Sequence, residues 1–287
     1  MDNSITLNNG VEMPRIGYGV YQVAKDVCAQ CVADALAVGY RMIDTAQSYA
    51  NEAEVGEGIR QSGVSREDIF LTTKLWIPNA DYARAKASID CSLEKLGTDY
   101  IDLLLIHQPY GDVFGAWRAM EEAQKAGKVR ALGVANFLSD HLINFCHYVD
   151  VLPTVDQVET HVFFQQKELR QYMEQFGIVH ESWAPFAEGR NDFFKNPVLA
   201  AVGQKYGKTG PQVALRYLYQ NDVVIIPKSV HRARMEENLN ILDFDLDAED
   251  LSAIEALDTG KSLFFDHHDP KIVEMMWQMA RERKGWE

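Results

Sequence analysis

Short runs of apolar and β-branched residues alternate with longer stretches of helical periodicity along most of the chain. Such short runs are typical of buried strands, and apolar positions spaced three and four residues apart are typical of helices that pack on one face. We expect strands at residues 15–22, 40–45, 69–76, 100–107, 129–136, 153–160, 179–185 and 223–230. Helical patterns lie between them, and several end at a glycine suited to a helix C-cap: Gly39, Gly97, Gly127 and Gly177. This alternation predicts parallel strands joined by crossover helices.

The number of β–α units indicates how the sheet closes. Eight units in 287 residues match the size of a (β/α)8 barrel, which typically takes about 250 residues. The remaining residues fit an N-terminal β-hairpin that turns at Asn9 and Gly10, a helix over 248–258 and a tail from about Gly260. We therefore predict an α/β fold, a single (β/α)8 TIM barrel domain over residues 1–287, with an N-terminal β-hairpin and a C-terminal helix plus tail.

An open, doubly wound sheet is the main alternative fold. It would place a phosphate-binding turn with three glycines after its first strand. The first predicted strand contains Gly17 and Gly19 but not the third glycine, so the barrel is favoured.

Composition narrows the possible partners. The formal net charge of −14 argues against non-specific binding to nucleic acid or to an anionic membrane, and any anionic ligand needs a local basic site. No apolar run approaches the roughly 20 residues that span a bilayer, and we expect no signal peptide, because Met1 leads into polar residues. Cys28 and Cys31 form a C-x-x-C within a helical pattern. We interpret them as core residues rather than as a redox or metal pair, and we expect a cytoplasmic protein.

Polar residues end three consecutive strands of the predicted barrel. Asp44, Lys74 and His107 are the last residues of their apolar runs, and Tyr49 follows Asp44 on the same loop. In a barrel the C-terminal ends of the strands form the active site. A lysine lowers the pKa of a neighbouring tyrosine, a carboxylate keeps that lysine charged, and a histidine orients a carbonyl oxygen. Each residue alone is a common buried polar group, but together they indicate proton delivery to an oxygen rather than hydrolysis.

Longer stretches around these residues resemble one family of enzymes. They are "GYRMIDTAQSYANEAEVG", "TTKLW", "SLEKLGTDYIDLLLIHQP", "GKVRALGVANF", "VDQVE" and "IPKSVHRARMEENL". With these stretches the chain resembles an aldo-keto reductase over nearly its whole length. It is most similar to the small prokaryotic members related to 2,5-diketo-D-gluconate reductase, because of "ESWAPFAEG" and the short loop after His107. The resemblance implies NADPH-dependent reduction of a carbonyl by hydride transfer, with a catalytic tetrad of Asp44, Tyr49, Lys74 and His107 in which Tyr49 is the general acid.

A basic stretch, "PKSVHRAR", follows the eighth predicted strand and begins a helix. Cations, a serine and the N–H groups of a helix start together suit a phosphate group, although a solvated basic patch has the same pattern. The resemblance implies that Lys228, Ser229 and Arg234 bind the 2′-phosphate of NADPH and that Glu237 and Asn238 lie near the adenine.

The nicotinamide end is expected between the fifth and seventh strands. By the resemblance, Asn136 and Gln157 would bind the carboxamide, and Trp183 would stack on the ring, although Trp183 also suits simple core packing. The chain departs from the wider family at four positions where serine, asparagine, tyrosine and tryptophan are common: Ala135, Asp156, Trp183 and Gln108. None of these belongs to the tetrad, so they affect cofactor affinity and substrate choice rather than the reaction class.

The substrate is expected to lie against Tyr21, Trp76, His107 and Gln108, with Phe264 or Phe265 of the tail above it. We expect small aldehydes, ketoaldehydes or keto sugars. His267 and His268 suggest a metal site, but without an evident third ligand we expect a solvated tail and no metal. By the resemblance the protein is a monomer.

Two other functions fit parts of the sequence. The alternative function is an NADPH-binding regulatory or structural barrel without significant turnover, against which the intact tetrad argues. A metal-dependent barrel hydrolase would need His and Asp ligand pairs that the sequence does not show.

Overall fold

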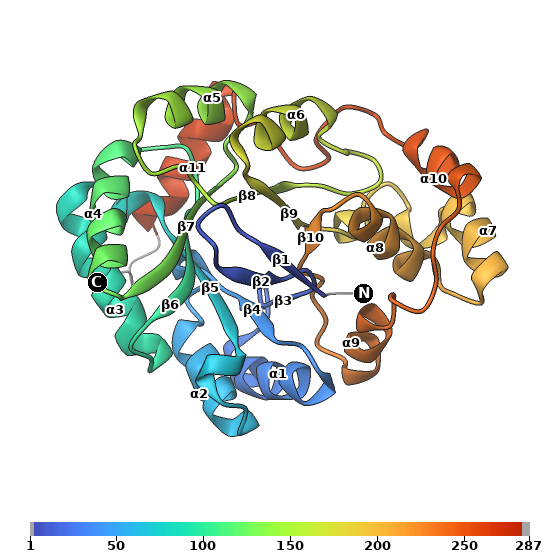
Figure 1. Cartoon of the computed structure of the whole chain (residues 1–287), viewed down its shortest axis with the longest axis horizontal. Coiled ribbons are helices and arrows are strands. Elements are labelled where there is room, and N and C mark those ends of the chain that lie inside the picture. The colour runs from blue at the N-terminus through green and yellow to red at the C-terminus, as the bar shows by residue number, and fades with distance from the viewer. Residues whose placement is uncertain (1–2, 283–287) are drawn as a thin grey trace.

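The computed structural model describes residues 3–282 and shows a ring of eight parallel strands surrounded by helices (Figure 1). The strands of the ring are β3 (Tyr18–Gly19), β4 (Met42–Asp44), β5 (Phe70–Leu75), β6 (Ile101–Ile106), β7 (Val129–Ala135), β8 (Val155–Glu159), β9 (Val179–Trp183) and β10 (Val224–Ile225). They are hydrogen-bonded in sequence order. A parallel bridge between Ile16 and Ile225 joins the last strand to the first, and the Gly17 N–H donates to the Ile225 carbonyl at 2.8 Å. The predicted (β/α)8 barrel is confirmed.

The helices follow the predicted periodicity. They are α1 (Lys25–Val38), α2 (Glu52–Ser62), α3 (Tyr82–Leu96), α4 (Val113–Lys125), α5 (Ser139–Tyr148), α6 (Lys167–Phe176), α7 (Pro197–Tyr206), α8 (Gly210–Gln220), α9 (Arg232–Leu239), α10 (Ala248–Glu255) and α11 (Pro270–Glu282). Gly39, Gly97 and Gly177 cap α1, α3 and α6 in the left-handed conformation, as their positions indicated. Cys28 and Cys31 lie buried on α1 with free thiols, in agreement with their interpretation as core residues.

Alternate residues of each strand face the barrel interior and the helices. On β6, Leu103 and Leu105 belong to the inner apolar cluster, while Leu104 and Ile106 belong to the larger cluster between strands and helices. Both faces are buried because helices cover the outside, so the strands read as continuous apolar runs. This two-residue period decides which side chains can reach the active-site end of the barrel.

A hairpin closes the N-terminal end of the barrel. Strands β1 (Ser4–Thr6) and β2 (Glu12–Pro14) pair antiparallel, and in Figure 1 they lie across the centre of the ring. Asn8 donates to the Pro153 carbonyl at 2.8 Å and Asn9 to the Arg130 carbonyl at 3.1 Å, both at the N-terminal ends of strands. The predicted hairpin is therefore confirmed. It covers the N-terminal end of the barrel and not the C-terminal end, where an active site is expected.

The expectation of a solvated C-terminal tail is wrong. Residues 270–282 form α11, and its Met276 and Ala280 pack with Trp76, Ile77 and Tyr110. His267 is buried at 6 % exposure. The tail is ordered because its apolar side chains cover those of the barrel rim, which would otherwise face water.

The single domain predicted over residues 1–287 stays a prediction, and its first two and last five residues lie outside the described range. Within residues 3–282, no helix combines the length and the apolar character needed to cross a membrane.

Candidate active site

The four predicted tetrad residues meet at the C-terminal end of neighbouring strands. Asp44 is the last residue of β4, Lys74 lies near the end of β5 and His107 directly follows β6. Met42, Phe70 and Leu105 belong to the inner apolar cluster. Asp44, Lys74 and His107 follow them at even spacing, so all three side chains also point to the interior of the barrel. Tyr49 ends the short 3-10 helix η1 (Gln47–Tyr49) in the loop after β4. The inner face of the barrel therefore changes from apolar to polar at this end.

The Lys74 ammonium is the centre of the site. Its Nζ donates to Asp44 Oδ1 at 2.6 Å and to the Thr45 carbonyl at 3.0 Å, and it lies 3.3 Å from the Tyr49 hydroxyl. The Lys74 side chain has no exposed surface. A buried ammonium ion is stable only when its charge is paired and its hydrogens are bonded, and here both conditions hold.

The pKa values show how these charges act on one another. Burial alone would lower the pKa of Lys74, but Asp44 and Tyr49 outweigh it and raise that pKa above its usual value. Burial raises the pKa of Tyr49 to about 12, while Lys74 acts in the opposite direction. Lys74 thus favours the tyrosinate as expected, although burial dominates and the expected net lowering is not found. Tyr49 consequently holds its proton at neutral pH.

His107 is held in the neutral state. Burial lowers the pKa of His107 well below its usual value, and the nearby Lys74 and His267 lower it further. The Ser48 hydroxyl lies 3.2 Å from His107 Nδ1. A neutral imidazole has one donor and one acceptor nitrogen, so a hydroxyl that donates to Nδ1 leaves the proton on Nε2. Ser48 was not singled out from the sequence, and its position next to Tyr49 was the one available signal.

The three residues expected at the nicotinamide lie together and have protein partners. Gln157 Nε2 donates to Asp44 Oδ2 at 3.0 Å. Asn136 Nδ2 donates to the His107 carbonyl at 2.9 Å and its Oδ1 accepts from the Trp183 indole N–H at 2.9 Å. Asn136 has a positive φ of 64°, a conformation that asparagine tolerates better than most residues. These contacts connect β7, β8 and β9 to the tetrad.

Two further carboxyl groups are buried near these strands. Glu181 has no exposed surface and lies two residues before Trp183, at an inward-facing position of β9. Burial and the nearby Asp44 raise the pKa of Glu181 to about 8, against the opposing influence of Gln157 and Lys74. Asp156 is also fully buried, and burial raises its pKa well above the usual range.

The basic stretch is arranged around the start of α9. Lys228 and Arg234 are exposed, whereas Ser229 is buried and its Oγ accepts from the His231 N–H at 3.1 Å. Arg232 forms ion pairs with Asp34 and with Glu236, so two carboxylates already partner its guanidinium group.

The two residues expected at the adenine lie further along α9. Glu237 accepts a hydrogen bond from the Thr209 hydroxyl at 2.6 Å, and Asn238 is buried. The cations that remain beside the helix start are Lys228 and Arg234, which fits a phosphate group.

The predicted substrate residues surround Tyr49 and His107. The Tyr21 ring is 5.0 Å from that of Tyr49 and is 48 % exposed, and the buried Trp76 ring is 5.0 Å from His107. Gln108 is buried, and its Oε1 has no hydrogen-bond partner among residues 3–282.

The segment 261–269 crosses the same end of the barrel. The rings of Phe264 and Phe265 lie 5.1 Å and 6.2 Å from that of Trp183. Glu159 at the end of β8 accepts from the Ser262 hydroxyl and from the Leu263 N–H. The segment is therefore anchored on the barrel rim, and its phenylalanines lie next to Trp183, the residue expected to stack on the nicotinamide ring.

Comparisons with known proteins agree with this fold and site. Residues 15–259 match the aldo/keto reductase family. The chain is 42% identical over 279 residues to morphine 6-dehydrogenase of Pseudomonas putida, covering 92% of this chain and 94% of that one. It is 43% identical over 259 residues to glyoxal reductase of Bacillus subtilis, covering 90% and 93%. The structure of a Bombyx mori aldo-keto reductase in complex with NADP superposes with a TM-score of 0.87 at 30% identity, covering 94% of this chain and 96% of that chain.

The chain therefore belongs to the aldo/keto reductase family. It is an oxidoreductase that acts on carbonyl groups, and the predicted relationship to the small prokaryotic members is confirmed. The alternative of a regulatory or structural barrel without turnover is not supported.

Proposed function

We propose that this protein reduces small aldehydes and ketoaldehydes to alcohols with NADPH, and that Tyr49 is the general acid. The observation that carries the proposal is the buried Lys74 ammonium, 3.3 Å from the Tyr49 hydroxyl and paired with Asp44 at 2.6 Å. A phenol beside a fixed cation gives up its proton to an oxygen on which negative charge develops.

Bound NADPH would supply the hydride that the carbonyl carbon accepts. The protein supplies the proton: the Tyr49 O–H bond breaks as the new alcohol O–H bond forms. Lys74 stabilises the resulting tyrosinate, and Asp44 keeps Lys74 charged during the transfer. Because burial holds the pKa of Tyr49 at about 12, the proton is present at physiological pH and leaves only when the substrate oxygen becomes strongly basic.

His107 positions the oxygen that receives this proton. It is neutral at physiological pH, since burial, Lys74 and His267 lower its pKa. In the tautomer in which the Ser48 hydroxyl donates to Nδ1, Nε2 carries the proton and can donate it in a hydrogen bond to the carbonyl oxygen. A neutral donor polarises the carbonyl without competing with Tyr49 as the proton source.

The residues present fit NADPH at both ends. Lys228, Arg234 and the start of α9 provide charge and N–H groups for a 2′-phosphate, in a chain with a net charge of −14. Asn136, Gln157 and Trp183 lie together at the rim, where amides and an indole suit a nicotinamide. Structural relatives carry NADP or NADPH in their complexes, which supports this cofactor.

Two of the relatives and the rim residues support a small, polar substrate. Glyoxal reductase and methylglyoxal reductase are both relatives at 40% identity or more. Phe264 and Phe265 restrict the space beside Trp183. The buried Oε1 of Gln108 has no hydrogen-bond partner among residues 3–282, which adds an unpaired acceptor next to His107. We also propose that the protein is a cytoplasmic monomer.

The test is the Tyr49→Phe substitution. We expect the variant to bind NADPH, measured by fluorescence titration, with a Kd close to that of the wild type. Its kcat with glyoxal or methylglyoxal should fall by about 10²–10⁴-fold, because the general acid is lost while the ring is kept. Tyr82→Phe on the surface of α3 is the matched control and should keep full activity. A Tyr49→Phe enzyme with the wild-type kcat would contradict the assignment.

A further inference from the structure

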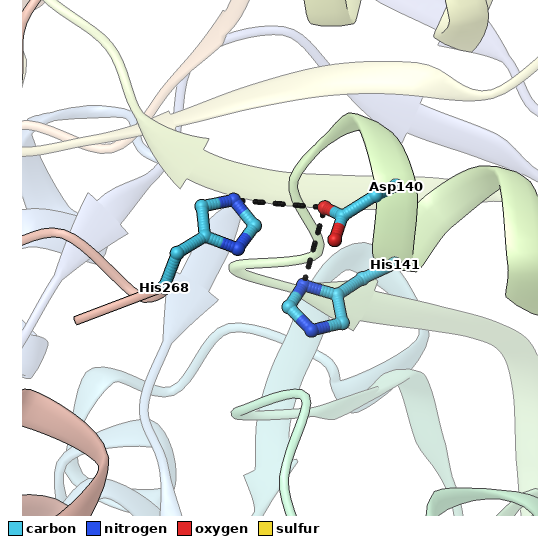
Figure 2. A group of neighbouring side chains, drawn as sticks. All are labelled: Asp140, His141 and His268. Carbon is cyan, nitrogen blue, oxygen red and sulfur yellow. Dashed lines mark ion pairs between the residues drawn. The ribbon is translucent and has the colours of Figure 1, made fainter. Parts of the chain in front are cut away.

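Three side chains with metal-binding atoms meet at the edge of the C-terminal segment. Asp140 and His141 lie in the first turn of α5, and His268 lies just before α11 (Figure 2). Asp140 Oδ1 is 3.7 Å from His141 Nδ1 and 3.6 Å from His268 Nε2. One ligand atom from each residue lies within 4.8 Å of the other two. In Figure 2 the dashed lines from one nitrogen of each imidazole end at the same carboxylate oxygen.

The distances from Asp140 Oδ1 to the two imidazole nitrogens are too long for good hydrogen bonds, although the three groups lie close together. A good N–H···O bond has a donor–acceptor distance of about 2.7–3.2 Å. Around a tetrahedral Zn²⁺ ion with bonds of about 2.0–2.2 Å, neighbouring ligand atoms lie roughly 3.3–3.6 Å apart. The two nitrogen–oxygen distances are close to that separation, and the ligand atoms of the two imidazoles lie within 4.8 Å of each other.

The Nδ1 atom of His141 lacks a good partner. It is buried and has no hydrogen-bond partner within the described part of the chain. Asp140 Oδ1, at 3.7 Å, is too far for a good hydrogen bond, so an ion between the two groups would give this nitrogen a partner.

The surroundings allow an ion to enter and hold His268 in place. The side chains of Asp140 and His268 are 66 % and 44 % exposed. The backbone N–H of His268 donates to Asp266 Oδ1 at 2.9 Å, and the rings of His141 and His268 are stacked at 5.3 Å and 7°. The positive end of α5 opposes a cation, but this effect is small beside that of two imidazoles and a carboxylate.

We propose that Asp140, His141 and His268 bind one divalent transition-metal ion of the Zn²⁺ type, with water in the fourth position. Two nitrogens and one carboxylate oxygen are a donor set that Zn²⁺ prefers. The ion joins α5 to the segment that carries Phe264 and Phe265, so it fixes that segment on the barrel rim. The site lies outside the tetrad, and the proposal does not depend on the proposed reaction.

The test is calorimetric titration of the chelator-treated, full-length protein with ZnCl₂. The wild type should bind one ion per chain. Both His268→Ala and Asp140→Asn should weaken binding by at least about tenfold, because the first removes a ligand and the second removes the negative charge of another. His147→Ala is the matched control, since His147 is an exposed histidine near the other end of α5. This control should bind Zn²⁺ as the wild type does.

A second readout separates this site from zinc bound elsewhere. Saturating Zn²⁺ should raise the Tm of the wild type and slow hydrogen exchange in residues 261–269, with neither effect in His268→Ala. The proposal is overturned if the wild type binds no Zn²⁺, or if His268→Ala binds it with unchanged affinity. Zinc that slows exchange equally in both proteins would overturn it as well.

Discussion

Glu181 is a buried acid beneath the lysine–tyrosine pair. It occupies an inward-facing position of β9, and neither carboxylate oxygen meets a hydrogen-bond partner at good geometry among residues 3–282. Burial and Asp44 raise its pKa to about 8, so at neutral pH it is largely protonated. Asp44 then remains the main counter-charge of Lys74, and a second anion does not compete with it.

The shifted pKa of Glu181 predicts a pH-dependent stability. The folded-state pKa is about 8, above the usual 4.5, so the folded protein binds more protons than the unfolded chain between these values. The free energy of unfolding should therefore fall as the pH rises from about 4.5 to 8. Glu181→Gln should remove this contribution. Between pH 5.5 and pH 8, its free energy of unfolding, measured with urea, should therefore rise by about 1–3 kcal/mol relative to that of the wild type.

An exposed glutamate gives the control for this measurement. Glu174→Gln on α6 should follow the pH dependence of the wild type. If the wild type and Glu181→Gln have parallel stability curves over this range, Glu181 is not protonated in the folded protein.

The tetrad was predictable because strand ends and residue type are both visible in the sequence. Asp44, Lys74 and His107 end apolar runs, and the two-residue period of a strand points them inward. Ser48 and Glu181 were not predicted, because their importance depends on which atoms lie within hydrogen-bond or Coulomb range across strands. The local sequence pattern predicts whether a side chain points into or out of the barrel, but it does not predict which residues of other strands the side chain contacts.

At the scale of elements, the C-terminal segment is where sequence and structure differ most. Helix α11 has apolar residues at helical spacing after Pro270, with Ile272, Val273, Met276 and Ala280 in one cluster. The helical spacing of these apolar residues was visible in the sequence. However, the repeating β–α pattern had already ended, and the acidic, histidine-rich stretch before α11 indicated a segment exposed to solvent. The contact of His268 with α5 could not be predicted, since it joins residues far apart in the chain.

Glu159 should control the order of this segment. It accepts hydrogen bonds from Ser262 and Leu263, and bonds to a charged acceptor contribute about 1.5–3 kcal/mol each. We expect Glu159→Ala to speed hydrogen exchange of residues 262–265 by about tenfold or more, measured by mass spectrometry. Glu168→Ala, an exposed glutamate on α6, should leave these rates unchanged. Equal exchange in the two variants would show that the phenylalanine contacts alone hold the segment.

At the scale of the whole molecule, the sequence predicted the barrel because a repeating β–α pattern leaves few alternatives. The distribution of charge is less visible. The chain has a net charge of −14, yet within residues 3–282 neither Lys228 nor Arg234 forms an ion pair with an acid at the start of α9, while Arg232 pairs with two acids. Under the proposed function, the phosphate of the cofactor approaches an acidic protein through this small basic site.

The cofactor interaction should therefore depend on salt and on one arginine. Raising the ionic strength should raise the KM for NADPH more than the KM for NADH, because screening acts on the 2′-phosphate contacts. Arg234→Ala should raise the KM for NADPH by about tenfold or more and reduce this salt dependence. Arg232→Ala is the matched control and should have a smaller effect. Comparable kcat/KM for both cofactors, unchanged in Arg234→Ala, would contradict the NADPH preference.

The closure of the ring has a consequence for the order of folding. Its seam joins Ile16 to Ile225, and across it the Tyr18 hydroxyl donates to the carbonyl of Ser229 at 2.6 Å. The first strand of the ring is thus complete early in synthesis but finds its second neighbour only after more than 200 further residues have left the ribosome. Until then one edge of β3 has no neighbouring strand. The proposed phosphate site at the start of α9 follows β10 in the chain, so we expect a nascent chain to bind the cofactor only after the strands at both ends of the barrel have been synthesised.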